Sequence, residues 1–326
     1  MRDVPSPAEL AASVRAGDTR ALARAISLLE DGDPAGRELV RLLYGDTGHA
    51  HAVGFTGAPG VGKSSLISAL VGHVRSLGLT VGVVSVDPSS PFTQGALLGD
   101  RIRLAAHFLD PGVFIRSMGT RGHPGGLAEA TLQTLLLLDA AGKDVVFLET
   151  VGTGQSEIGV LSIADTVVLV LQPGAGDSVQ ALKAGIMEIP DVIVVNRLDH
   201  PQARATAADV RQALSLGHEP PPPIVLTDAL RGDGIDELWA AIADHKASLE
   251  ARGGLEQRRA DNLANEVFAV ASARARRHLE NAVSGDPELL RLLDQVRRRE
   301  LDPLTAVHLI LGKVFHIGDQ DGPDAR

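Results

Sequence analysis

The stretch HAVGFTGAPGVGKSS, residues 51 to 65, decides the fold of this chain. It opens with a strand-like apolar run, continues as a glycine-rich loop and leads into a helix-period pattern from about Lys63 to Leu77. The loop matches the pattern G-x-x-x-x-G-K-S/T in full, with a strand before it and a helix after it. Glycines let backbone N–H groups turn toward phosphate oxygens, and the N-terminus of the helix adds the positive end of its dipole. The stretch therefore predicts a strand–loop–helix unit that cradles the phosphates of a nucleotide.

Two side chains of the loop are expected to carry chemistry. The ammonium of Lys63 would neutralise the β and γ oxygens, and the hydroxyl of Ser64 would bind Mg²⁺. The alternative is a chance match in a glycine-rich turn. The nucleotide-binding positions expected here are Gly57, Ala58, Pro59, Gly60, Val61, Gly62, Lys63, Ser64 and Ser65.

Strand-like and helix-like segments alternate from residue 51 to about residue 251. Continuous apolar runs alternating with helical patterns are typical of a parallel sheet covered on both faces, so the fold class is α/β, a mostly parallel, doubly wound sheet. The strand-like runs after the first are 79–87, 112–117, 144–150, 164–172, 191–196 and 223–227, and the helical patterns lie near 99–109, 125–142 and 234–251.

The flanking parts of the chain are helical. Residues 1–47 indicate either a helical cap on the main domain or an arm that grips a partner, and residues 48–252 form the nucleotide-binding domain. Residues 253–316 show helix periodicity and no strands, so this extension must pack on the main domain or on a second chain. The tail at 317–326 is expected to be disordered.

Composition narrows the classes of function. The chain has 326 residues, a net charge of −10 and no Cys. The negative charge argues against a general affinity for nucleic acid, and without Cys no disulfide or thiolate metal site can form. No apolar stretch approaches the ~20 residues of a membrane span and no signal sequence is present, so a cytoplasmic location is expected. His49 and His51 are the closest pair among the 11 histidines, and we expect them at the surface.

The order Asn196-Arg197-Leu198-Asp199 follows a buried strand-like run and resembles the N-K-x-D element of GTPases. A carboxylate at Asp199 can accept hydrogen bonds from N1–H and the 2-amino group of guanine. Adenine has neither donor and would leave a buried carboxylate unpaired, which gives large discrimination. Asn196 would tie the loop to its neighbours, and Arg197 stands where Lys is usual. The element predicts guanine as the base; the alternative is a polar turn after a strand.

A second loop, TDAL at 227–230, follows the last strand-like run. GTPases usually carry an S-A-x turn here, whose backbone reads the guanine carbonyl, and Asp228 replaces the usual Ser. The further contacts expected with the base are at Asp228, Ala229 and Leu230.

Acidic residues end two of the predicted strands. GTPases usually show D-x-x-G where this chain has ETVG, so Glu149 would hold Mg²⁺ directly or through water and the N–H of Gly152 would approach the γ-phosphate; alternatively Glu149 is a surface acid. Asp87 is well placed for the metal or the attacking water, and Asp100 is either a helix N-cap or catalytic. The predicted catalytic residues are Lys63, Asp87, Asp100 and Glu149, and the predicted metal ligands are Ser64, Asp87 and Glu149.

Five motifs follow one another along the chain: GAPGVGKSSLISAL, VDPSSPFTQGALLGDRIRL, ETVGTGQSE, LQPGAGDSVQALKAGIMEI and NRLD. In this order and spacing they resemble the MeaB/ArgK GTPases, also called methylmalonyl-CoA mutase-associated GTPases, of the SIMIBI class of P-loop proteins. The resemblance covers residues of about 20 to 316, which is nearly the whole chain.

This resemblance implies a P-loop GTPase domain with N-terminal helices and a C-terminal extension that forms a homodimer. It implies slow hydrolysis of GTP to GDP with Mg²⁺, coupled to an adenosylcobalamin-dependent acyl-CoA mutase. The GTPase would gate cobalamin loading and protect or reactivate that mutase. An extra switch is implied at 172–183, through Asp177, Gln180 and Lys183, although a glycine-rich loop capped by Asp177 is equally readable from the residues. Gln94 departs from the Gly that the family mostly has.

Three other functions stay open. One is a protein kinase acting on an amino-acid transport component, although NRLD favours guanine whereas most such kinases use ATP. Another is a GTPase for the maturation of nickel enzymes, although these carry His-rich or Cys-containing metal motifs and the histidines here are scattered. The third is a binding regulator with degenerate catalysis; the intact Lys63 and Ser64 argue against loss of nucleotide binding but do not establish turnover.

Overall fold

The computed structural model describes residues 5–87, 104–119, 126–150, 161–174, 190–215 and 221–316. By its internal contacts the chain divides into two compact units, Met1–Val267 and Phe268–Arg326. The first unit contains the sheet and is called the nucleotide unit below; the second is helical and is called the C-terminal unit.

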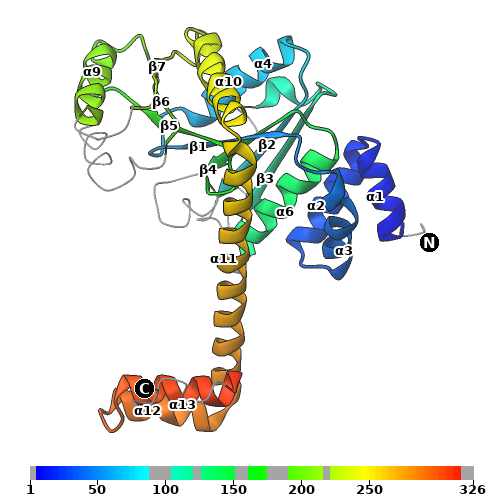
Figure 1. Cartoon of the computed structure of the whole chain (residues 1–326), viewed down its shortest axis with the longest axis vertical. Coiled ribbons are helices and arrows are strands. Elements are labelled where there is room, and N and C mark those ends of the chain that lie inside the picture. The colour runs from blue at the N-terminus through cyan, green and yellow to red at the C-terminus, as the bar shows by residue number, and fades with distance from the viewer. Residues whose placement is uncertain are drawn as a thin grey trace. The chain divides into compact units, whose positions relative to one another are not determined.

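The described strands of the nucleotide unit form one parallel sheet in the order β3-β2-β4-β1-β5-β6-β7 (Figure 1). They are β1 (His51–Thr56), β2 (Val81–Asp87), β3 (Val113–Gly119), β4 (Val145–Thr150), β5 (Thr166–Leu171), β6 (Val192–Val195) and β7 (Ile224–Leu226). Strands β1, β4, β5 and β6 are buried along their whole length, as their continuous apolar runs predict. The parallel α/β fold expected from the sequence is therefore confirmed, with β1 in the middle of the sheet.

Helices cover both faces of the sheet (Figure 1). Helices α4 (Lys63–Ser76) and α10 (Ile235–Ala251) share a hydrophobic core with residues such as Phe55 of β1 and Phe147 of β4. Helix α6 (Gly126–Ala140) packs on the opposite face, against residues such as Leu148. Helix α9 (Ala203–Leu214) covers β6 and β7.

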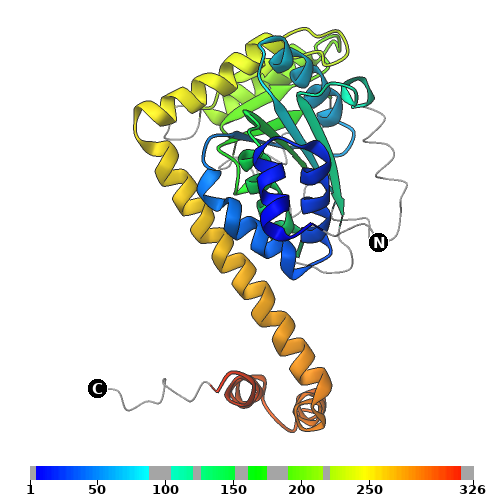
Figure 2. The ribbon, with the colours of Figure 1, turned by 90° about the vertical axis from the view of Figure 1, so that its right-hand side faces the viewer.

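Three short helices at the N-terminus complete the α6 side: α1 (Pro7–Arg15), α2 (Thr19–Glu30) and α3 (Pro34–Leu43). They lie together in Figures 1 and 2 and share one apolar core with α6 and the sheet. The break between α1 and α2 has a local cause, because Gly17 takes φ 76° and the carboxylate of Asp18 accepts hydrogen bonds from the first N–H groups of α2. These three helices therefore pack as a cap on the nucleotide unit.

Three further segments differ from the sequence expectation or refine it. The helical pattern at 99–109 is described only from Leu104 onward, where it forms one 3₁₀ turn, η2 (Ala105–His107). A second 3₁₀ turn, η1 (Tyr44–Asp46), leads from α3 toward β1. Helix α11 (Gly254–Gly285) starts beside the boundary proposed at 252/253, yet the division between the two units falls inside it, after Val267.

The C-terminal unit consists of the second half of α11 with α12 (Pro287–Arg297) and α13 (Pro303–Phe315). Lys313 on α13 joins it to the start of α12 through ion pairs of 2.7 Å with Asp286 and 2.5 Å with Glu288. Few of its apolar side chains are buried, among them Leu289 and Ile310.

Candidate nucleotide-binding site

The glycine loop after β1 has the backbone that a phosphate cradle needs. Gly57, Gly60 and Gly62 take φ values of 142°, 81° and 96°. A Cβ atom on Gly57 would lie 2.2 Å from the carbonyl oxygen of Val170, and one on Gly62 would lie 2.5 Å from Nδ2 of Asn196. The loop is therefore pressed against β5 and against the loop after β6, and only glycine fits at these two positions.

Lys63 is the first residue of α4, as expected, and its side chain is buried. Its Nζ donates hydrogen bonds to the carbonyl oxygens of Gly57 (2.6 Å) and Ala58 (3.2 Å). The ammonium thus lies folded over the loop, beside the backbone that would surround a phosphate group.

Ser64 and Glu149 meet at the carboxyl edge of the sheet. The Ser64 hydroxyl donates to Oε1 of Glu149 at 2.6 Å, and Ser85 on β2 donates to Oε2 at 3.3 Å. Glu149 is only 2% exposed, so the alternative of a surface acid is wrong. A buried carboxylate and a serine hydroxyl in contact are oxygen donors of the kind that Mg²⁺ prefers, and they fit such an ion.

Asn196 joins the NRLD loop, residues 196–199, to its neighbours with one side chain. Its Nδ2 donates to the carbonyl oxygen of Val61 at 2.9 Å. Its Oδ1 accepts from the hydroxyl of Thr227 and from the N–H of Ala229, both at 3.2 Å. The phosphate loop, the NRLD loop and the TDAL loop therefore meet at this residue, as expected from the sequence for Asn196.

Arg197 and Asp199 lie at the surface of the same loop. Arg197 adopts a left-handed φ of 61°, which is uncommon outside glycine, and its Nη2 donates to the carbonyl oxygen of Gly60 at 3.3 Å. The guanidinium of Arg197 thus bridges the NRLD loop and the phosphate loop. Asp199 is exposed, and its carboxylate is open to a ligand from solution.

Asp228 is engaged in its own turn. The residue is 6% exposed, and Oδ1 accepts from the N–H groups of Leu230 (3.0 Å) and Arg231 (3.1 Å). Its carboxylate shapes the TDAL turn, which gives a physical reason for Asp in place of the usual Ser. Leu230 is 90% exposed beside it.

The side chains of several predicted residues lie outside the described part of the chain. Asp87 is described only through its backbone, which ends β2 beside Gly119 of β3. The others are Gln94, Asp100, Gly152, Asp177, Gln180 and Lys183.

Ser85 and Thr227 make hydrogen bonds in the site, to Glu149 and Asn196, that were not predicted from the sequence. Ser85 is the one hydroxyl residue in the apolar strand VGVVSVD, and that interruption is a usable signal. Thr227 is the first residue of the TDAL loop, and only the hydrogen bond to Asn196 reveals its part in the site.

The amino edge of the sheet carries a different group of polar residues. His51 Nε2 lies 2.9 Å from the hydroxyl of Thr166, which lies 2.9 Å from Nδ1 of His245. His51 is 3% exposed, so the expectation that both His49 and His51 lie at the surface is wrong for His51. Burial lowers the pKa of His51 to about 4, which keeps the ring neutral.

Among the residues that the structure describes, no group of three or more His, Asp or Glu side chains is arranged to hold a metal ion.

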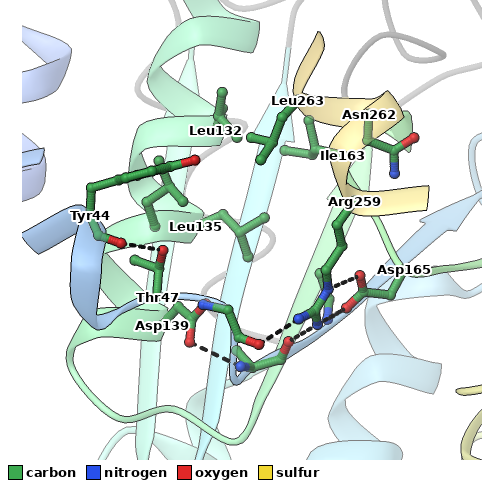
Figure 3. A pocket seen from close by; sticks show the side chains of 14 residues that line it. Tyr44, Thr47, Leu132, Leu135, Asp139, Ile163, Asp165, Arg259, Asn262 and Leu263 are labelled. Atoms are coloured by element: carbon green, nitrogen blue, oxygen red, sulfur yellow. Dashed lines mark hydrogen bonds and ion pairs between the residues drawn. The ribbon is translucent and has the colours of Figure 1, made fainter. Parts of the chain in front are cut away.

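A cavity of about 100 Å³ lies at the same edge, between η1, α6 and the start of α11 (Figure 3). Apolar side chains such as Leu135, Ile163 and Leu263 form its walls. At one end Nε and Nη2 of Arg259 donate to the two carboxylate oxygens of Asp165, each at 2.7 Å. The cavity includes none of the predicted nucleotide-binding residues, which follow the opposite ends of the strands.

A phosphate loop after the central strand, tied through one asparagine to a guanine-type loop after β6, belongs to one class of protein, the P-loop GTPases. The profile of the family described as methylmalonyl Co-A mutase-associated GTPase MeaB matches residues 22–284. The chain belongs to this family.

Individual relatives agree with that assignment. A putative GTPase of Pyrococcus horikoshii is 45% identical over 312 residues, which cover 94% of this chain and 98% of that protein. The methylmalonic aciduria type A homolog, mitochondrial, of Caenorhabditis elegans is 32% identical over 80% of this chain and 71% of that protein. The crystal structure of a LAO/AO transport system kinase has a TM-score of 0.74 and 28% identity, and the match covers 97% of this chain and 99% of that one. In the described parts of this chain, no helix is long and apolar enough to cross a membrane.

Proposed function

We propose that this GTPase uses its nucleotide state to gate cobalamin loading onto an adenosylcobalamin-dependent acyl-CoA mutase of the methylmalonyl-CoA type, and to protect or reactivate that mutase. The family description and the name of the nematode relative support a mutase of this type as the partner. The structural observation that supports the nucleotide part is the Asn196 junction, because this side chain joins the phosphate loop, the NRLD loop and the 227–230 turn.

We assign the residue roles as follows. The loop 57–65 binds the phosphates, with Lys63 against the β and γ oxygens, and Asp199 with the 227–230 turn reads guanine. Ser64, Glu149 and Asp87 hold Mg²⁺, which when bound neutralises phosphate charge. Asp100 and Gly152 serve catalysis and γ-phosphate contact, and Asp177, Gln180 and Lys183 form the partner-sensing switch.

The assembly and location are also proposals. We infer a homodimer formed through the C-terminal unit, where Phe268 and Leu304 expose 72% and 74% of their surface. A cytoplasmic location stays a prediction of the sequence.

Co-purification tests the partner. The purified chain is mixed with methylmalonyl-CoA mutase in the presence of GDP or of a non-hydrolysable GTP analogue, and the complex is quantified by gel filtration. We expect the amount of complex to depend on the nucleotide and Lys63→Ala to lose that dependence, because its phosphate contacts are gone. A complex that forms equally with either nucleotide, or none at all, would contradict the gating role.

Transfer of labelled phosphate separates the proposal from the kinase alternative. With γ-labelled GTP and the mutase present, we expect all label to appear as inorganic phosphate. Label on protein would favour a kinase instead.

A further inference from the structure

The carboxylate of Glu149 is held from two sides by hydroxyl groups. Ser85 lies opposite Glu149 in the parallel register of β2 and β4. Both side chains point to the face covered by α4, because their neighbours of the other parity, such as Val84 and Leu148, pack in the core on the α6 side. Oε1 receives the Ser64 hydroxyl at 2.6 Å and Oε2 receives the Ser85 hydroxyl at 3.3 Å.

We propose that Ser85 is a positioning residue for the magnesium site, which fixes the carboxylate oxygen that Glu149 presents to Ser64 and the phosphate loop. The inference rests on the proposed role of Glu149 in holding Mg²⁺. It adds a residue from a strand that carries neither the phosphate loop nor the carboxylate itself.

The length of the glutamate side chain is the reason a second anchor is needed. GTPases usually carry Asp here, and Glu has one more rotatable bond, so its carboxylate has more orientations to lose when it binds an ion. Glu149 and Ser85 are each 2% exposed, so water does not replace a missing Ser85 hydroxyl freely. Partners that orient metal ligands in this way commonly contribute tenfold or more to metal affinity, and a single hydrogen bond typically contributes about fivefold.

Release of a fluorescent GDP analogue, followed against Mg²⁺ concentration, measures the site without relying on turnover. For Ser85→Ala we expect the Mg²⁺ midpoint to rise by about five- to tenfold. The release rate in EDTA should stay within about twofold of wild type, because the loop contacts to the nucleotide are unchanged. Ser85→Thr keeps the hydroxyl, and its midpoint should match wild type.

Thr150→Val is the matched control for loss of a buried hydroxyl. Thr150 is 1% exposed and its hydroxyl donates to the carbonyl oxygen of Phe55 at 3.3 Å, so this variant should leave the midpoint where it is. The proposal would be overturned if the Mg²⁺ midpoint of Ser85→Ala matched wild type. It would also be overturned if Ser85→Thr or Thr150→Val raised the midpoint as much as Ser85→Ala does.

The double variant shows whether Ser85 acts through Glu149. Glu149→Gln should raise the midpoint further, and Ser85→Ala should add nothing in that background. An additive effect would overturn the proposal. If Glu149→Gln leaves the Mg²⁺ midpoint unchanged, both the proposed role of Glu149 and the Ser85 inference are wrong. If Glu149→Gln raises the midpoint and Ser85→Ala does not, only the Ser85 inference is wrong.

Discussion

His51 is a neutral imidazole buried at the start of the strand that leads into the phosphate loop. Its pKa falls from 6.5 to about 4 in the folded chain, chiefly through burial, so between these values the unfolded chain binds more protons. The contribution of His51 to the free energy of unfolding is therefore complete above pH 6.5. It is lost as the pH falls toward 4, by up to about 3 kcal/mol. Urea unfolding of wild type and His51→Gln from pH 4 to 7 measures this loss, and the variant should show the shallower decline. Parallel declines would contradict the assignment.

Glu266 on α11 carries the opposite pH dependence. It is 2% exposed, its Oε1 has no hydrogen-bond partner in the described structure, and both burial and the nearby Glu129 raise its pKa. The folded chain holds this proton more tightly than the unfolded one, so the contribution to stability is full below pH 4.5 and is lost as the pH rises.

Glu266→Gln removes the buried charge. We expect the variant to gain about 1 kcal/mol over wild type at pH 8 and little or nothing at pH 4.5. Thermal melts at the two pH values measure the difference. A variant that is less stable than wild type at pH 8 would show that the carboxylate has a partner in the folded chain.

At the scale of elements, two arginines fasten the first turns of α11 to the amino edge of the sheet. Arg258 pairs with Asp191 at 2.7 Å, and Arg259 pairs with Asp165 and donates to the carbonyl oxygen of Ala50 at 2.7 Å. Asp165 is 2% exposed, so its ion pair is well shielded from water. These contacts explain why the start of α11 belongs to the nucleotide unit.

Arg259→Ala should lower the free energy of unfolding of the nucleotide unit by about 3–5 kcal/mol, because it leaves the buried charge of Asp165 without its cation. Arg41→Ala is the control in the same unit: its pair with Glu38 is exposed to solvent, so its loss should destabilise the unit far less. Thermal unfolding of the two variants tests this order. Equal losses would mean that the Asp165 pair adds no more than a surface pair.

Elements that rely on local pattern were predictable and contacts across strands were not. The apolar runs of β4, β5 and β6 and the glycine loop before α4 all lie where the sequence indicates. The stretch near 99–109 has helical periodicity, yet its described part makes one 3₁₀ turn, since a pattern so short depends on its surroundings. The contact between Ser85 and Glu149 depends on the register of β2 and β4, which no single stretch of sequence encodes.

At the scale of the whole molecule, the exposed apolar residues of the C-terminal unit suggest a partner surface. These are Phe268, Leu290, Leu304, Val307 and Leu309. If they form the proposed homodimer, Phe268→Glu combined with Leu304→Glu should give a monomer, because charges would be buried without partners in the interface.

Sedimentation velocity distinguishes the two states. Leu109→Glu, at a 95% exposed leucine of the nucleotide unit, is the control and should leave the dimer intact. A double variant that still sediments as a dimer would place the interface elsewhere.

The nucleotide preference of the full chain tests whether the loops joined by Asn196 form a guanine site read by Asp199. Xanthine carries a 2-carbonyl where guanine has an amino group, and an amide can donate to that carbonyl. Asp209→Asn, at another exposed carboxylate of the unit, is the control. Calorimetric titration of Asp199→Asn with GTP and with xanthosine triphosphate is the decisive measurement. We expect the affinity for GTP to fall by at least about tenfold and the affinity for xanthosine triphosphate to rise. An unchanged affinity for GTP would show that Asp199 does not read guanine.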